Sequence, residues 1–310
     1  MEATDQLAWS VAFQLASSDR INLSPHIIVL MRWFILYFVF ILLPELALAA
    51  KPQRVVSLNL CADQLLLQLS EPESIVSLTN LSVDPELSYL AKEAAEYPVN
   101  SGSAEEILKM NPDLVLAGSF TARPAVSYLK KKEFRVVELS IPESMKAMRE
   151  QYLKVADLLG EREKAERQLR EMDRRIAQAK SSGDENLVAA VYYANGFTAG
   201  KKSITTEVLN HAGFENLSEK SGVDSFGFYP LEKLIEAEPD LLILGSYNKD
   251  RHSLAQKLLD HPALKRFWGE SDRGQARVII PDALWICATP VIAEAVEILA
   301  QKRKEIVSRR

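Results

Sequence analysis

One segment of this 310-residue chain occurs twice, and this repeat constrains the fold more than any other feature. Residues 105–118 read EEILKMNPDLVLAG and residues 232–245 read EKLIEAEPDLLILG, with five of 14 aligned positions identical. Each copy has the pattern of a short amphipathic helix that ends at a Pro-Asp turn and is followed by a buried strand and a glycine. The copies lie 127 residues apart, which is too far for a solenoid repeat. The repeat therefore predicts two similar α/β lobes with a cleft between them.

The rest of the chain supports two lobes joined by a helical middle region. Short apolar strands alternate with helices on both sides of that region, which is typical of parallel βαβ units. We predict an N-terminal lobe at 50–159, an interdomain helix at 160–182 and a C-terminal lobe at 183–310. At 1.5 Å per residue the middle helix would span roughly 30 Å. Its apolar heptads are too few for a convincing coiled-coil dimer, so a monomer is expected.

The N-terminal region has the pattern of an export signal. Met31 and Arg32 precede an unbroken apolar run at 33–43, and Ala47-Leu48-Ala49 forms a small-residue cleavage site. This arrangement predicts a signal peptide at 31–49 and a mature protein in the periplasm. The apolar run is too short to span about 30 Å of hydrocarbon comfortably, which disfavours a membrane anchor. Residues 1–30 lack the signal pattern, and we interpret them as an over-called upstream segment with Met31 as the true start.

Composition and missing motifs argue against several function classes. A net charge of −5 and a pI near 5.6 disfavour nucleic acid as a partner. The sequence has no Gly-rich phosphate loop, no HExxH and no Gly-x-Ser-x-Gly elbow, so an exported hydrolase is disfavoured and no enzymatic activity is expected. Beyond the predicted signal there are three histidines, His211, His252 and His261. None is predicted on a strand-end loop, which disfavours direct binding of a bare metal ion.

Several further motifs together resemble a known family. They are residues 54–58 (RVVSL), 196–201 (GFTAGK), 203–204 (SI), 212–217 (AGFENL), both Pro-Asp repeats, and Trp285 followed by Thr289-Pro290. In this order, behind a signal peptide, the chain resembles the extracytoplasmic cobalamin and ferric-siderophore binding proteins of ABC importers. The resemblance extends over about residues 51–301.

The resemblance implies a fold of two Rossmann-like lobes with parallel-rich sheets, joined by one long helix, with the ligand cleft between the lobes. It implies little hinge motion, a bound cobalt corrinoid or iron chelate, no cofactor, and permease subunits in the inner membrane as partners. One exposed glutamate per lobe, Glu105 and Glu232, would dock onto permease arginines. The same glutamates lie in helix first turns, where a carboxylate is favoured by about 0.3–1 kcal/mol. A receptor for a signalling partner, and a receptor for haem or a bare metal ion, remain alternatives.

Ligand contacts are expected on the loops that follow the carboxyl ends of parallel strands. Aromatic rings on these loops suit a macrocycle or a chelate, because they bury large flat areas. The candidate ligand-binding residues are Cys61, Phe120, Asn195, Phe197, Phe226, Tyr229, Tyr247, Trp285 and Cys287. Arg123 follows the Phe120 loop and is expected on the surface.

The two cysteines leave three alternatives open. An exported protein with two cysteines usually pairs them, and a Cys61–Cys287 disulfide would tie one edge of the cleft. Two free thiols could instead face the ligand or a soft metal. Two inert buried cysteines are the third alternative.

Overall fold

The computed structural model describes residues 51–121, 123–180, 185–245, 257–259, 261–264 and 276–310. The predicted signal peptide, the segment before it, Tyr247 and His252 lie outside the described residues. Within the described ranges no helix has the length and apolar character needed to cross a membrane.

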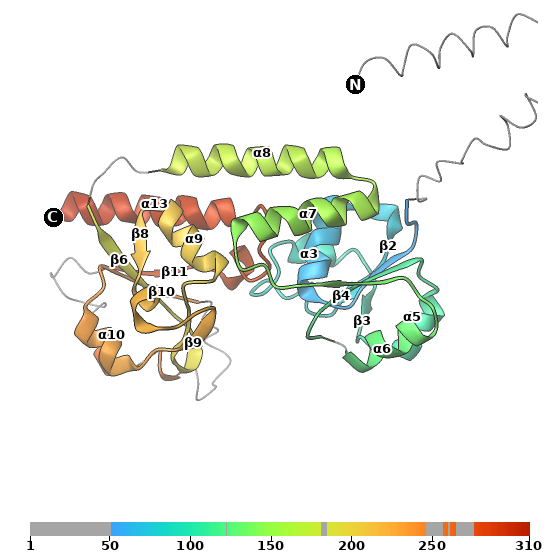
Figure 1. Ribbon diagram of the computed structural model, residues 1–310, viewed down its shortest axis with the longest axis horizontal. Coiled ribbons are helices and arrows are strands. Elements are labelled where there is room, and N and C mark those ends of the chain that lie inside the picture. Colours follow the sequence, from blue (N-terminus) through green and yellow to red (C-terminus); the bar gives the residue numbers. More distant parts are fainter. Residues whose placement is uncertain (1–50, 122, 181–184, 246–256, 260, 265–275) are drawn as a thin grey trace, which may run out of the picture. The chain divides into compact units, whose positions relative to one another are not determined.

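The N-terminal lobe is built on a five-stranded parallel sheet in the order β3-β2-β1-β4-β5. Its strands are β1 (Val55–Ser57), β2 (Ile75–Thr79), β3 (Val99–Asn100), β4 (Leu114–Gly118) and β5 (Val136–Leu139). Its helices are α3 (Leu60–Leu69), α4 (Ala91–Ala94), α5 (Ala104–Met110) and α6 (Arg123–Lys131). Parallel pairing requires a crossover between neighbouring strands, and helices supply most of these crossovers (Figure 1).

The C-terminal lobe repeats this plan with four parallel strands in the order β11-β10-β6-β8. These strands are β6 (Leu187–Tyr192), β8 (Phe214–Asn216), β10 (Leu241–Leu244) and β11 (Ala276–Ile279). The helices of this lobe are α9 (Ile204–His211), α10 (Leu231–Ala237) and the C-terminal α13 (Ile292–Arg309). The fold is therefore the predicted pair of α/β lobes with parallel sheets.

The two copies of the repeat occupy equivalent places in the two sheets. The first copy forms α5 and β4, and β4 lies between β1 and β5. The second forms α10 and β10, and β10 lies between β6 and β11. Each helix ends at a residue in the left-handed region directly before the proline, Asn111 (φ 45°) and Glu238 (φ 43°). The sequence repeat is thus a repeated piece of structure.

The aspartate of each Pro-Asp turn fixes the start of the neighbouring strand. The Asp113 carboxylate accepts hydrogen bonds from the backbone N–H groups of Gln53 (2.7 Å) and Arg54 (3.0 Å), just before β1. The Asp240 carboxylate accepts one from Val188 N–H (2.8 Å) in β6. Bonds from N–H groups to a carboxylate are stronger than neutral ones, so both aspartates help to set the register at the amino end of the sheet.

The glycine that closes each repeat leaves room for a side chain from the neighbouring strand-end loop. A Cβ atom at Gly118 would lie 2.8 Å from Asn59 Nδ2, and one at Gly245 would lie 2.6 Å from Tyr193 Cδ1. Contacts under about 3 Å between such atoms are not tolerated without movement. Gly245 is therefore required by the close approach of the Tyr193 ring, whereas at Gly118 the nearest atoms are the ends of the Asn59 and Thr121 side chains, which would have to move.

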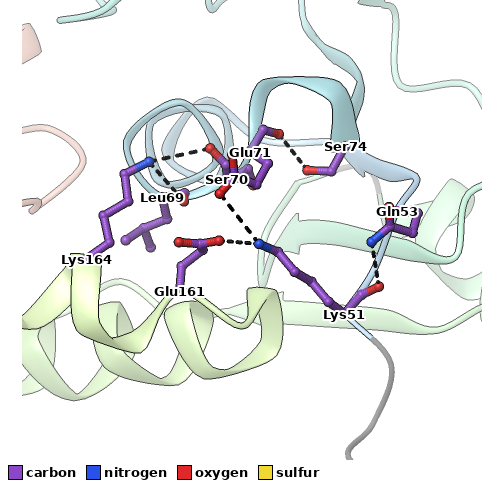
Figure 2. A network of polar contacts seen from close by, with 8 residues as sticks. All are labelled: Lys51, Gln53, Leu69, Ser70, Glu71, Ser74, Glu161 and Lys164. Carbon is purple, nitrogen blue, oxygen red and sulfur yellow. Dashed lines mark hydrogen bonds and ion pairs between the residues drawn. The ribbon is translucent and has the colours of Figure 1, made fainter.

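Two helices, α7 (Met145–Leu159) and α8 (Arg162–Ala179), lie between the lobes in the sequence, and α8 packs along both α7 and α13 (Figure 1). Helix α8 occupies the range predicted for an interdomain helix, while the division into domains stays a prediction. Figure 2 shows how its first turn is held to the N-terminal lobe. Glu161 pairs with Lys51, and Lys164 Nζ donates to the Leu69 carbonyl at 3.1 Å. The bond from Lys51 holds the pKa of Glu161 below its ordinary value.

The other end of α8 is attached to the C-terminal lobe. The Arg175 guanidinium donates to both carboxylate oxygens of Glu297 on α13, at 2.9 and 2.6 Å. This two-bond geometry fixes the relative position of the two groups more tightly than a single contact would. Helix α8 is therefore bonded to one lobe at its start and to the other near its end.

A single apolar core extends through both lobes. It includes Leu66 on α3, Tyr152 on α7, Met172 on α8, Val208 on α9 and Val296 on α13. Two smaller clusters cover the opposite faces of the two sheets. Because interiors are close-packed, a lobe cannot rotate away from the other without opening this shared core.

A buried carboxylate lies at the edge of this core. Asp63, in the first turn of α3, is 0% exposed and accepts hydrogen bonds from Thr79 N–H (3.0 Å) and Thr79 Oγ1 (2.5 Å). Burial raises its pKa to about 6, although the hydrogen bonds from Ser57 and Thr79 act in the opposite direction. The native protein therefore holds this proton at pH values where the unfolded chain has released it.

We predict that the free energy of unfolding falls by about 2 kcal/mol between pH 4 and pH 7 on account of Asp63 alone. The pKa is higher in the folded state, so the contribution is complete below about pH 4 and lost above about pH 6. Asp63→Asn removes this titration and keeps partners for Thr79. Urea denaturation of both proteins at several pH values measures the difference. A constant difference across the range would contradict the prediction.

Candidate functional site

A pocket of about 370 Å³ lies between loops of the two lobes. Its described lining is Ser119, Phe120, Ser140, Ile141, Pro142 and Glu143 from the first lobe, with Lys202, Ser203, Ser225 and Phe226 from the second. This volume is within the range of small-molecule sites. Large side chains at its rim, including Phe120 and Ile141, are well exposed, so the apolar surface continues beyond the pocket.

The N-terminal wall is made by the loops after two adjacent strands. Ser119 and Phe120 follow β4, and residues 140–143 follow β5. The loops are joined because Ser119 donates from both N–H and Oγ to the Leu139 carbonyl, at 2.9 and 2.7 Å. Phe120 is 79% exposed and extends from this fixed base. The rule that parallel sheets bind ligands at their carboxyl edge thus applies to this lobe.

The C-terminal wall is a two-stranded antiparallel ribbon that carries three phenylalanines. Strand β7 (Phe197–Ala199) pairs with β9 (Phe226–Phe228), with Phe197 opposite Phe228. The Phe197 and Phe226 rings are stacked at 5.8 Å, and Phe197 meets Phe228 edge to face at 5.6 Å. Phe226 and Phe228 are 48% and 66% exposed. Rings that already contact one another lose little freedom on binding a flat ligand.

Two hydrogen bonds connect the two lobes in this region, and the first joins two lining residues. Ser225 Oγ donates to Glu143 Oε1 at 3.2 Å, between the ribbon and the loop after β5. The backbone N–H of Met145, at the start of α7, donates to Glu207 on α9 at 2.6 Å. A carboxylate at a helix N-terminus satisfies an otherwise free N–H group and is favoured by the helix dipole. These bonds hold the loop at 140–145 against both lobes.

A disulfide also joins the lobes. Cys61, at the start of α3, is bonded to Cys287, which follows β11, and their Cα atoms are 4.8 Å apart. Cys287 is 6% exposed, and Cys61 is half-buried. Of the three alternatives left open by the sequence, the structure has the disulfide. Nearby, Gln68 Nε2 donates to Thr289 Oγ1 at 3.2 Å and Tyr89 donates to Glu294 at 2.8 Å, again between lobes.

Comparison with known proteins identifies the family to which this architecture belongs. The family model for periplasmic binding proteins matches residues 55–267, which is more than half of the chain. The chain belongs to this family. A curated relative, the cobalamin-binding protein of Halobacterium salinarum, is 24% identical over 212 residues. That alignment covers 64% of this chain and 56% of the relative, so the chain matches little more than half of the relative's length.

Solved structures with the same fold include the periplasmic heme-binding protein RhuT from Roseiflexus sp. RS-1, in apo form. It has a TM-score of 0.67 and 21% identity, covering 82% of this chain and 98% of RhuT. The periplasmic vitamin B12 binding protein BtuF of Vibrio cholerae has a TM-score of 0.60 and 15% identity, covering 83% and 98%. At these identities the likeness concerns the fold.

In this periplasmic binding protein, the sequence-predicted ligand residues fall into distinct groups. Phe120 and Phe226 line the pocket, and Phe197 stacks on Phe226. Asn195 is exposed and Tyr229 half-buried at the base of the ribbon, outside the described lining. Trp285 is predicted in the cleft, but the structure buries its ring at 4% exposure within the shared core. Trp285 directly follows a short 3-10 helix, Asp282–Leu284, and its backbone N–H donates to the Asp282 carbonyl.

Most of the polar lining was not among the predicted residues. Residues 140–143 follow β5, and the strand-end rule applied to that strand would have indicated them. Ser225 has no comparable signal, because the ribbon that presents it depends on pairing between β7 and β9. Arg123 bonds to Glu138 and to the Ser119 carbonyl, so it supports the loop and stays on the surface as expected.

The two glutamates with a predicted docking role lie in equivalent first turns of α5 and α10. Both are exposed, and Glu105 forms an ion pair with Lys109 at 2.9 Å. Ser103 is the N-cap of α5, and its hydroxyl oxygen accepts a hydrogen bond from the backbone N–H of Glu106. The Glu106 carboxylate in turn accepts a hydrogen bond from the backbone N–H of Ser101. Capping of α5 therefore does not need the side chain of Glu105.

We predict that Cys61→Ala with Cys287→Ala lowers the free energy of unfolding by about 2–5 kcal/mol, because the disulfide closes a long loop in the unfolded chain. The cysteines are 226 residues apart. Denaturation with and without reductant measures the effect. Reductant should destabilise the parent protein and leave the double variant unchanged. Equal stability of the two proteins would contradict the prediction.

Proposed function

We propose that this chain is the extracytoplasmic solute-binding protein of an ABC importer. It captures a metal chelate, either a cobalt corrinoid such as cobalamin or a ferric siderophore, and delivers it to the permease in the inner membrane. The observation that carries the proposal is the aromatic pocket shared by two lobes whose relative position is fixed. The signal-peptide pattern at 31–49 supports a periplasmic location.

The chemistry of the pocket supports binding rather than catalysis. Among the described lining residues there is no histidine and no thiol that could act as a base or a nucleophile. The described residues also contain no cluster of three His, Cys, Asp or Glu side chains that could hold a metal ion.

The fixed lobes support a particular mode of capture. Helix α8, the shared core and the disulfide resist a large closing motion, so affinity comes mainly from surfaces that exist before the ligand arrives. Phe120 on one wall and the Phe197–Phe226–Phe228 group on the other would contact opposite sides of a flat chelate. Preformed aromatic walls reduce the entropy lost on binding.

We predict that Phe120→Ala combined with Phe226→Ala weakens chelate binding at least tenfold, because two ring contacts are each worth about 0.5–1.5 kcal/mol beyond their buried area. Calorimetric titration with cyanocobalamin, an uncharged ferric hydroxamate, a ferric catecholate and haem identifies the chelate and measures the loss. Tyr128→Ala, an exposed ring on α6 outside the lining, is the matched control. An unchanged affinity of the double variant would show that the two rings do not contribute to chelate binding. Failure of the parent protein to bind any of the chelates would refute the proposed function.

Delivery depends on Glu105 and Glu232 under this proposal. We expect Glu105→Arg with Glu232→Arg to abolish uptake by cells while the affinity of the purified protein stays within about twofold. Each reversal disfavours a helix N-terminus by about 0.3–1 kcal/mol, which the protein should tolerate. Glu163→Arg with Glu171→Arg on α8 makes the same charge change away from both helices and should leave uptake intact. Normal uptake by the first variant would exclude the docking role.

A further inference from the structure

The serine hydroxyl groups in the pocket wall are oriented in a way that limits what they can bind. Each of the four donates its hydrogen to a protein acceptor. The acceptors are the Leu139 carbonyl for Ser119 (2.7 Å), Gln151 Oε1 for Ser140 (3.3 Å), the Gly200 carbonyl for Ser203 (2.7 Å) and Glu143 Oε1 for Ser225 (3.2 Å). A hydroxyl has one hydrogen and two lone pairs. Ser119, Ser140 and Ser225 therefore offer a ligand acceptors and no donors, whereas Ser203 is 2% exposed and its oxygen already accepts from Thr206 N–H.

The charged groups of the wall strengthen this bias. Glu143 and Lys202 are the two charged residues in the described lining. Lys202 Nζ lies 3.2 Å from the Asp224 carboxylate, which is outside the described lining, and both side chains are well exposed. Glu143 accepts one hydrogen bond, from Ser225, and an ionised carboxylate can accept about four. The described wall is therefore rich in acceptors, and its carboxylate keeps free acceptor capacity while its one ammonium group is paired with a carboxylate outside the wall.

From this polarity we infer that the pocket selects an uncharged chelate whose periphery donates hydrogen bonds, as carboxamide N–H groups do, and that Glu143 enforces the selection. The inference rests on the proposed function. Carboxamides supply the donors that the serines and Glu143 lack. Chelates with several carboxylates or catecholates supply more acceptors and negative charge, which Glu143 repels and which the serine oxygens cannot pair.

A matched pair of corrinoids tests the inference. Dicyanocobinamide has a periphery of carboxamides, and dicyanocobyrinic acid has carboxylates in their place on the same ring. Calorimetric titration of the full mature protein should give at least tenfold tighter binding of the carboxamide form. An uncharged ferric hydroxamate and an anionic ferric catecholate form a second pair, in which the uncharged chelate should bind more tightly.

Glu143→Gln tests the residue itself. Glutamine keeps an oxygen that can accept the hydrogen bond from Ser225, but it removes the negative charge and adds an N–H donor. The ratio of the affinities for the uncharged and the anionic chelate of each pair should therefore fall about tenfold. Glu163→Gln makes the same change at an α8 side chain that is 94% exposed, and it should leave the preference unchanged. Thermal unfolding of both variants checks that each is folded.

The outcomes separate the inference from the function on which it rests. Equal or tighter binding of the anionic members overturns the selectivity and leaves the proposed function standing. A preference that Glu143→Gln does not change overturns the role of Glu143. Failure of every chelate to bind the parent protein overturns the proposed function together with the inference.

Discussion

The apolar core shared by the two lobes is the interaction on which the rest of the structure depends. Its members come from both sheets and from helices α3, α7, α8, α9 and α13, so neither lobe has a complete interior of its own. The polar contacts between lobes, including the disulfide and the bond from Met145 to Glu207, lie at the margins of this core. Packing therefore brings the lobes together, and the polar contacts define the spacing between the pocket walls.

The sequence predicted those parts of the fold that depend on local patterns. The repeat at 105–118 and 232–245 indicated two α/β lobes, because periodicity and the Pro-Asp turn are visible without tertiary context. It did not reveal that Asp113 and Asp240 bond to the backbone of the neighbouring strand, since that partner lies far away in the chain. The ribbon of β7 and β9 was missed for the same reason, because its pairing joins residues about 30 positions apart.

The candidate site was predictable to a similar extent. Phe120 was indicated by its place on a predicted strand-end loop and Phe226 by its place just before the second copy of the repeat, and both line the pocket. Trp285 is also an aromatic residue on a predicted strand-end loop, yet it is buried. Position on a loop does not tell whether the side chain faces solvent or the core. Polar residues such as Glu143 and Ser225 acquire their role from a hydrogen bond between lobes, which no local pattern encodes.

The position of the two aspartates has a consequence for how such a protein can diversify. Both set strand alignment at the amino edge of their sheets, whereas the pocket is built at the carboxyl edge. Insertions and exchanges in the loops around Phe120 or Ser225 leave those alignment bonds untouched. The same framework can therefore accept a different solute through loop replacement alone, which recommends it as a starting point for engineered small-molecule sensors.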